Sequence, residues 1–182
     1  AQFSALPVFL VTFLGETLPL PRPFTVVATQ NPYDFHGTFP LPDSQLDRFL
    51  IRLSMGYPDR ESERAVLREG GLERQVPDSP VEPVQVIELI EAADWIAVSV
   101  EVEDYLLELV ARTRTDVRLL RGVSTRGAQL LYRACRARAL VEGRGFVVPE
   151  DVRDLAVPVL AHRVLPRSGG GPSGEGGRQA VE

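Results

Sequence analysis

A polar cluster that follows an apolar run offers the first side chains that could do chemistry. Residues Phe24 to Thr29 are apolar or β-branched, which predicts a central strand covered on both faces. Thr29, Gln30 and Asn31 stand at its carboxyl end. In open α/β sheets ligands bind outside the carboxyl ends of the strands, so Asn31 is a candidate contact for a ligand or a water molecule. The alternative is that Asn31 and Pro32 only begin a turn.

Three linked motifs point to a family. They are Thr-Gln-Asn-Pro at 29–32, Gly-Thr-Phe-Pro-Leu-Pro at 37–42 and Gln-Leu-Asp-Arg-Phe at 45–49. In this order and spacing they resemble the second half of the AAA+ ATPase core of the MoxR family. The resemblance implies that Asn31 is sensor 1, which positions the water that attacks the γ-phosphate. It also implies that Arg48 is the arginine finger.

The second half of the chain carries two further motifs of this kind. Gly-Val-Ser-Thr-Arg at 122–126 and the segment Gly-Arg-Gly-Phe-Val-Val-Pro-Glu-Asp-Val at 143–152 resemble the small lid domain of the same family. The resemblance, which covers about residues 11–165, implies that Arg126 is the sensor 2 residue that contacts the nucleotide.

Arginine suits the chemistry that these motifs imply. Charge builds on the γ-phosphate oxygens during phosphoryl transfer, and a guanidinium stays charged and grips two oxygens at once. We expect Arg48 to face a neighbouring subunit of a ring. Arg126 begins a helix, whose amino end favours anions, and should serve the nucleotide of its own subunit. The alternative for each is a surface arginine paired with a carboxylate, and Asp47 beside Arg48 makes that pairing plausible.

The elements around the first motifs are short. The pattern from Leu10 to Leu20 predicts a hairpin with Gly15 at its turn. A short helix is expected to carry Gln45 to Phe49, and Leu50 to Met55 suits the next parallel strand. Asp59 can then cap a helix whose apolar residues turn inward, namely Ala65, Val66 and Leu67.

Helical periodicity dominates the rest of the chain. Apolar stripes predict helices over Val84 to Ile96, around Tyr105 to Val110 and over Arg126 to Glu142, and Pro149 opens a last one. Ser124 or Thr125 can cap the longest helix, and Gly143 ends it. Its expected core residues are Leu130, Leu131, Ala134, Ala137 and Leu140.

The expected fold class is therefore α/β. Residues 1–71 would form a partial AAA+ core with the parallel sheet of P-loop NTPases, and residues 84–165 a small all-α lid domain. Residues 72–83 contain three prolines and predict a linker, and residues 166–182 are a glycine-rich tail expected to be disordered.

Composition limits what this chain does by itself. All twenty basic residues are arginine, so the chain cannot supply the lysine of a P-loop. Glu16 is the only acidic residue before Asp34, so the acidic pair of Walker B is also missing. The chain begins at Ala1 rather than Met, which favours a truncated or processed start.

Other function classes are disfavoured. A net charge of −5 argues against general nucleic-acid binding, and no apolar run reaches the length of a membrane span. A single cysteine, Cys135, indicates a reducing, cytoplasmic setting. No metal site is expected: His36 and His162 look like surface or loop residues, and the acids between Glu101 and Glu108 look like a solvated helix face.

Two functions from different classes remain. The first is a fragment of a MoxR-type ATPase that uses ATP and Mg²⁺ in a full-length parent, assembles as a homo-oligomeric ring, a hexamer, and remodels or activates a partner protein. The resemblance implies that such a partner carries a von Willebrand factor A-type domain. The alternative is a non-catalytic interaction module that lacks a nucleotide site of its own.

Overall fold

The computed structural model describes residues 10–13, 16–29, 42–69 and 81–167. The chain divides into two units, residues 1–39 with 79–91 and residues 40–78 with 92–182. In the first unit, strands β1 (Leu10–Phe13) and β2 (Glu16–Pro19) pair antiparallel, with Leu10 opposite Pro19. This pairing confirms the predicted hairpin. Helix α3 (Pro83–Ala93) lies mostly in the same unit.

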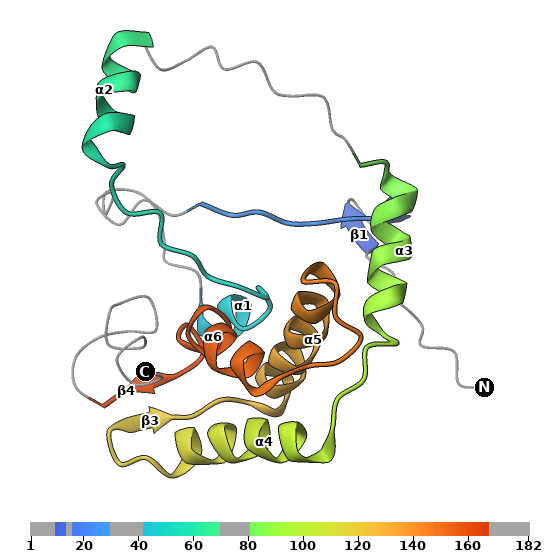
Figure 1. The fold of residues 1–182 in the computed structure, drawn as a ribbon, viewed down its shortest axis with the longest axis vertical. Coiled ribbons are helices and arrows are strands. Elements are labelled where there is room, and N and C mark those ends of the chain that lie inside the picture. Colours follow the sequence, from blue (N-terminus) through green and yellow to red (C-terminus); the bar gives the residue numbers. More distant parts are fainter. Residues whose placement is uncertain (1–9, 14–15, 30–41, 70–80, 168–182) are drawn as a thin grey trace. The chain divides into compact units, whose positions relative to one another are not determined.

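The second unit contains most of the segment predicted to be a helical lid, called the lid below. Helices α5 (Thr125–Val141) and α6 (Pro149–Leu160) pack against each other, and α4 (Val100–Thr115) contacts both (Figure 1). Strand β3 (Leu119–Arg121) pairs antiparallel with β4 (Leu165–Pro166) and joins α4 to α5.

Local chemistry sets the ends of α5 and α6. The Ser124 hydroxyl accepts a hydrogen bond from the backbone N–H of Gly127 at 3.1 Å and so caps α5. Gly143 follows the helix with a φ of 71°, a conformation that glycine adopts without steric cost. Pro149 is the first residue of α6. All three were predicted from the sequence.

The lid core is apolar and continuous. Its largest fully buried side chains include Leu131 of α5, Leu160 of α6 and Val110 of α4. The prediction for α5 was right for Leu131 and Ala134 but wrong for Ala137, which is exposed. The buried stripe of α5 runs through Cys135 and Ala139 instead, because α4 and α6 cover that side of the helix.

Two predicted strands are absent. Residues 24–29 and 50–55 form no strand, and Val27, Leu53 and Met55 are 85%, 77% and 97% exposed. A buried strand needs neighbouring strands that satisfy its backbone groups on both sides, and within the described residues no strand pairs with either segment. The predicted parallel sheet is therefore not seen in the described part of the chain.

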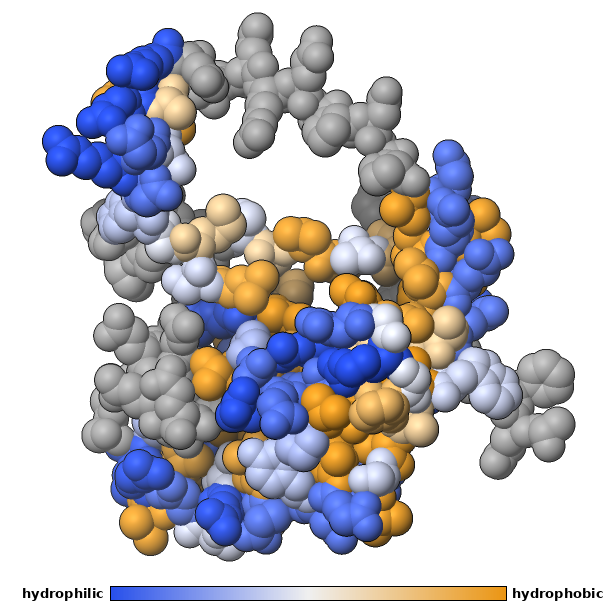
Figure 2. All heavy atoms as spheres, viewed as in Figure 1, coloured by the Kyte–Doolittle hydropathy of each residue, from blue (hydrophilic) through white to orange (hydrophobic). Residues whose placement is uncertain are grey.

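Helix α2 (Arg60–Glu69) also departs from the prediction. Its cap is confirmed, since the Asp59 carboxylate accepts from the backbone N–H of Ser62 at 2.8 Å. Its apolar residues do not turn inward: Val66 and Leu67 are exposed. Figure 2 shows hydrophilic side chains over most of this helix, and no described segment covers its apolar stripe.

The short helix α1 (Asp43–Leu46) and the residues after it attach to the end of α6. The backbone N–H of Arg52 donates to Pro158 O at 2.9 Å. His162 lies 3.2 Å from Phe49 O through Nε2 and is 2% exposed. The expectation of a surface histidine was wrong, because residues 49–52 cover this part of the lid.

A buried ion cluster joins the end of α5 to the start of α6. Asp151 is 1% exposed, and its two carboxylate oxygens accept from Arg144 at 2.9 and 2.7 Å. The backbone N–H of Val148 donates to it at 3.0 Å, and Arg138 Nε lies at 3.3 Å. Burial raises the pKa of Asp151, but these hydrogen bonds and positive charges outweigh burial and hold the pKa below its ordinary value.

We expect Asp151→Asn to lower the free energy of unfolding by about 2 to 4 kcal/mol, because Arg144 and Arg138 then lose their shared buried carboxylate. Urea denaturation of the chain at neutral pH, followed by circular dichroism, measures the loss. The matched control is Asp154→Asn, which removes a more exposed acid that also pairs with Arg138. Equal losses in the two variants would contradict a special role for the buried carboxylate.

His162 predicts a second effect on stability. Burial, followed by the charge of Arg163, lowers the pKa of His162 from 6.5 to about 4. In the unfolded chain His162 is therefore protonated below about pH 6.5, whereas in the folded chain it stays neutral down to about pH 4. Above pH 6.5 both states hold a neutral His162, and the folded state has its full stability. As the pH falls toward 4, the free energy of unfolding drops by up to about 3 kcal/mol. The slope of unfolding free energy against pH should be shallower in His162→Gln over this window. The same slope in both proteins would refute the assignment.

Candidate functional site

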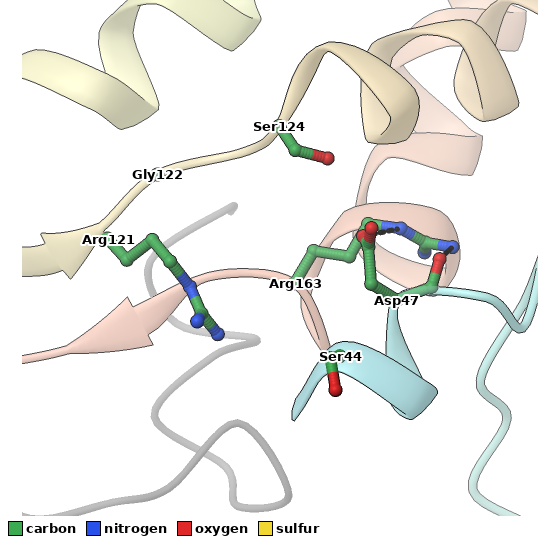
Figure 3. Close-up of a pocket in the computed structure, with 6 residues that line it drawn as sticks. All are labelled: Ser44, Asp47, Arg121, Gly122, Ser124 and Arg163. Atoms are coloured by element: carbon green, nitrogen blue, oxygen red, sulfur yellow. Dashed lines mark hydrogen bonds and ion pairs between the residues drawn. The ribbon is translucent and has the colours of Figure 1, made fainter. Parts of the chain in front are cut away.

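A pocket of about 180 Å³ lies within the second unit, between α1, the start of α5 and the turn after α6 (Figure 3). The side chains and backbone that line it come from Ser44, Asp47, Arg121, Gly122, Ser124 and Arg163. Segments far apart in the sequence thus meet here, including those next to Arg48 and Arg126.

The link from β3 to α5 forms one wall of the pocket. It passes so close to α4 that a Cβ at Gly122 would lie 2.4 Å from Thr113 O, so only glycine fits. The Thr113 hydroxyl accepts from the backbone N–H of Val123 at 3.0 Å, and Arg114 Nε donates to Val123 O at 2.9 Å. These contacts fix where α5 begins.

Arg126 is the second residue of α5 and is exposed. The amino end of a helix carries a partial positive charge, so this position adds to the attraction of the guanidinium for an anion. The next residue, Gly127, packs against the stem of Arg163: a Cβ there would lie 3.0 Å from Arg163 Cδ. The start of α5 is therefore in direct contact with the turn after α6.

Arg48 lies in the turn that follows α1, not within the helix as predicted, and is exposed. Its backbone N–H donates to Gln45 O at 3.1 Å. The neighbouring Asp47 turns away from it, since Asp47 Oδ1 lies 3.1 Å from Arg163 Nε. Within the described residues, neither Arg48 nor Arg126 forms an ion pair.

Arg163 is the most deeply buried charge in the pocket wall, with its side chain 1% exposed. Burial lowers the pKa of Arg163 and the charge of Arg126 lowers it further, whereas Asp47 raises it. A guanidinium starts from so high a pKa that Arg163 remains charged. In Figure 3, Arg163 and Asp47 lie against each other, and Arg121 extends from the end of β3.

This arrangement suits the binding of anionic oxygens. The pocket wall contains the side chains of Arg121, Asp47 and Arg163, and Asp47 pairs with Arg163. Arg48 adjoins Asp47, and Arg126 lies two residues after Ser124, so further guanidinium groups stand close to the pocket in the sequence. Among the described residues, no group of three His, Cys, Asp or Glu side chains gathers as metal ligands, and no helix is long and apolar enough to cross a membrane. Cys135 is no nucleophile, because burial raises the pKa of its thiol to about 12.

The structure describes two of the three site residues predicted from the sequence. Asn31 lies outside the described residues. Arg48 and Arg126 are both described: Arg48 adjoins Asp47 and Arg126 lies two residues after Ser124, and Asp47 and Ser124 line one pocket. Sequence reasoning missed Arg163 and His162, because a His-Arg pair after a helix carries no spacing that distinguishes buried from exposed residues.

Comparison with known proteins covers most of the chain. Residues 2–51 match the model of the "ATPase family associated with various cellular activities (AAA)", and residues 111–181 match the AAA lid domain. Chaperone MoxR1 of Mycobacterium tuberculosis is 35% identical over 85% of this chain and 44% of its own length. Protein MoxR of Paracoccus denitrificans is 32% identical over 77% of this chain and 48% of its own length.

A further relative and a solved structure are similar over most of this chain as well. The uncharacterized protein YeaC of Bacillus subtilis is 40% identical over 85% of this chain and 49% of its own length. A crystal structure from Cytophaga hutchinsonii superposes with a TM-score of 0.78 at 35% identity, over 87% of this chain and 52% of that one. The chain thus spans about half the length of the curated relatives it matches. It belongs to the MoxR family of AAA ATPases and contains the C-terminal portion of their AAA domain together with the lid.

Proposed function

We propose that this chain is the arginine-finger and lid portion of a MoxR-type ATPase, in which ATP hydrolysis by a homo-hexameric ring remodels or activates a partner protein. Arg48 contacts the γ-phosphate of the nucleotide bound to a neighbouring subunit. Arg126 contacts the nucleotide of its own subunit, and Asn31 positions the attacking water. The partner carries a von Willebrand factor A-type domain.

The observation that carries this proposal is the pairing of Asp47 with Arg163. Asp47, the residue before Arg48, could have neutralised it as an ordinary surface pair. Because its carboxylate faces Arg163 instead, Arg48 keeps an exposed guanidinium with no ion-pair partner in the described part of the chain. An arginine held in this state suits a phosphate that arrives from another subunit.

The surroundings of Arg126 support an anionic ligand as well. Its guanidinium is exposed at the amino end of a helix of 17 residues, and that end is fixed by the Ser124 cap. The phosphates of ATP fit these donors. Bound ATP would supply the scissile phosphoanhydride, and the arginines would stabilise charge as it develops on the γ-phosphate oxygens. Mg²⁺ would be held by the parts of the ATPase core that carry the P-loop and Walker B.

The remodelling role draws on the relatives. The protein from Mycobacterium tuberculosis is named a chaperone, which fits an ATPase that acts on other proteins. The parallel sheet of the full AAA core belongs to the same proposal, because residues 24–29 and 50–55 would gain neighbouring strands in the complete core. The competing function, a non-catalytic interaction module, predicts that Arg48 is dispensable for turnover.

The chain alone should not hydrolyse ATP, because it has no lysine to reach the β- and γ-phosphates. Steady-state release of inorganic phosphate from Mg-ATP measures this directly. The expected rate equals that of the buffer control. A rate above the control that disappears when magnesium is chelated would contradict the prediction and would require a nucleotide site within these residues.

In a full-length protein that joins this chain to a P-loop and Walker B, Arg48→Ala should lower turnover by about 10³ to 10⁵, the usual effect of losing an arginine finger. Nucleotide affinity should barely change, because each subunit keeps its own binding site. The matched control is Arg133→Ala, which removes another exposed arginine from α5 and should leave turnover unchanged.

Mixing experiments then assign the subunit. Arg48→Ala subunits mixed with subunits disabled in Walker B should regain activity, because an intact P-loop can sit opposite an intact finger. If mixed rings form but never exceed the summed activity of the separate variants, Arg48 does not act across the interface.

A further inference from the structure

The buried guanidinium of Arg163 is surrounded by backbone carbonyl groups from the segment that carries Arg48. Arg163 Nη2 donates to Asp47 O at 3.2 Å and also to Phe49 O. Its Nη1 lies 3.4 Å from Leu50 O and donates to Val159 O on its own side of the contact. Three of these four carbonyls belong to residues 47–50, more than 110 positions away in the sequence.

These contacts fix the backbone on both sides of Arg48. The carbonyl before it belongs to Asp47 and the one after it to Phe49, and Arg163 binds both. Asp47 is held a second time through its carboxylate, 3.1 Å from Arg163 Nε. Arg48 is the one residue of the segment 47–50 whose backbone and side chain make no contact with Arg163 among the contacts described. The Arg48 side chain therefore extends from a backbone whose neighbouring carbonyl groups, those of Asp47 and Phe49, are both hydrogen-bonded to Arg163.

A second contact links Arg163 to the other candidate arginine. The absence of a Cβ at Gly127 leaves room for the stem of Arg163, which passes beside the start of α5, one residue from Arg126. Arg163 thus lies between the two segments whose arginines are proposed to act on phosphate. Its guanidinium binds the first segment through several donors, while its stem packs beside the second.

From this geometry we propose that Arg163 is a positioning residue: it sets the direction in which Arg48 leaves the lid and couples that direction to the start of α5. The inference rests on the proposed function, since Arg48 must act on a phosphate for its direction to matter. A misplacement of about 1 Å at a catalytic group can cost about 100-fold in rate. Arg163 therefore matters for turnover without touching the nucleotide.

The first test uses this chain and measures amide hydrogen exchange by mass spectrometry. In Arg163→Met the apolar stem remains but every donor is lost, so exchange over residues 49–52 should become at least about tenfold faster. Protection across α4 and α5 should stay as in the wild type. The matched control is Arg167→Met, which removes a bond to Val117 O instead and should leave residues 49–52 unchanged. Unchanged exchange over residues 49–52 in Arg163→Met would overturn the proposal.

Arg163→Lys covers the case in which Arg163→Met unfolds. A lysine keeps the buried charge but has one nitrogen, which cannot span carbonyls on both sides of Arg48. If both variants lose protection throughout α4 and α5, Arg163 is a general folding residue and the proposal is wrong.

The second test measures turnover in a full-length protein that carries this chain with a P-loop. Arg163→Met should lower kcat by about 100-fold and leave KM for ATP within about threefold. The double variant with Arg48→Ala should match Arg48→Ala alone within about twofold, because Arg163 acts through Arg48. A merely structural residue would add its own loss to that of Arg48→Ala.

Comparing the Arg48→Ala and Arg163→Met variants separates the proposed function from the positioning role of Arg163. If Arg48→Ala leaves turnover unchanged, the proposed function fails and the positioning role fails with it. If Arg48→Ala abolishes turnover and Arg163→Met does not change kcat, only the positioning role is overturned.

Discussion

A buried positive charge organises the candidate site. The guanidinium of Arg163 has left water, and a charge of this kind is tolerated only where acceptors replace its hydration. The carbonyl groups that replace it come largely from residues 47–50, together with the carboxylate of Asp47. The attachment of this segment to the lid is therefore a condition for burying Arg163, because without these carbonyl groups a buried guanidinium would lack acceptors.

This attachment decides the state of the two arginines that the family resemblance singles out. Asp47 is occupied by Arg163, so its charge is not available to Arg48. Gly127 leaves room for Arg163 beside the start of α5, so Arg126 is presented from the same neighbourhood. Both arginines are exposed, and the carboxylate next to Arg48 is paired with Arg163, a residue that no motif marks.

The sequence predicted what local chemistry controls. The cap by Ser124, the first-turn position of Pro149 and the antiparallel hairpin depend on a few adjacent residues, and all were confirmed. The predicted strand over residues 24–29 is not seen in the described part of the chain, because a buried strand depends on neighbours that its own sequence does not specify. Arg163 was missed for a related reason. Its burial depends on backbone carbonyl groups from the other half of the chain, and every residue has such a group, so the sequence does not show which ones will bind it.

The most direct measurement of the central claim is a structure of the full-length ring with a non-hydrolysable ATP analogue and Mg²⁺. The account predicts that the Arg48 guanidinium lies within about 3 Å of a γ-phosphate oxygen bound to the adjacent subunit. It also predicts that Arg163 still binds the carbonyl groups on both sides of Arg48. An Arg48 side chain that points into solvent, or that pairs with a carboxylate of its own subunit while the nucleotide is bound, would contradict the account.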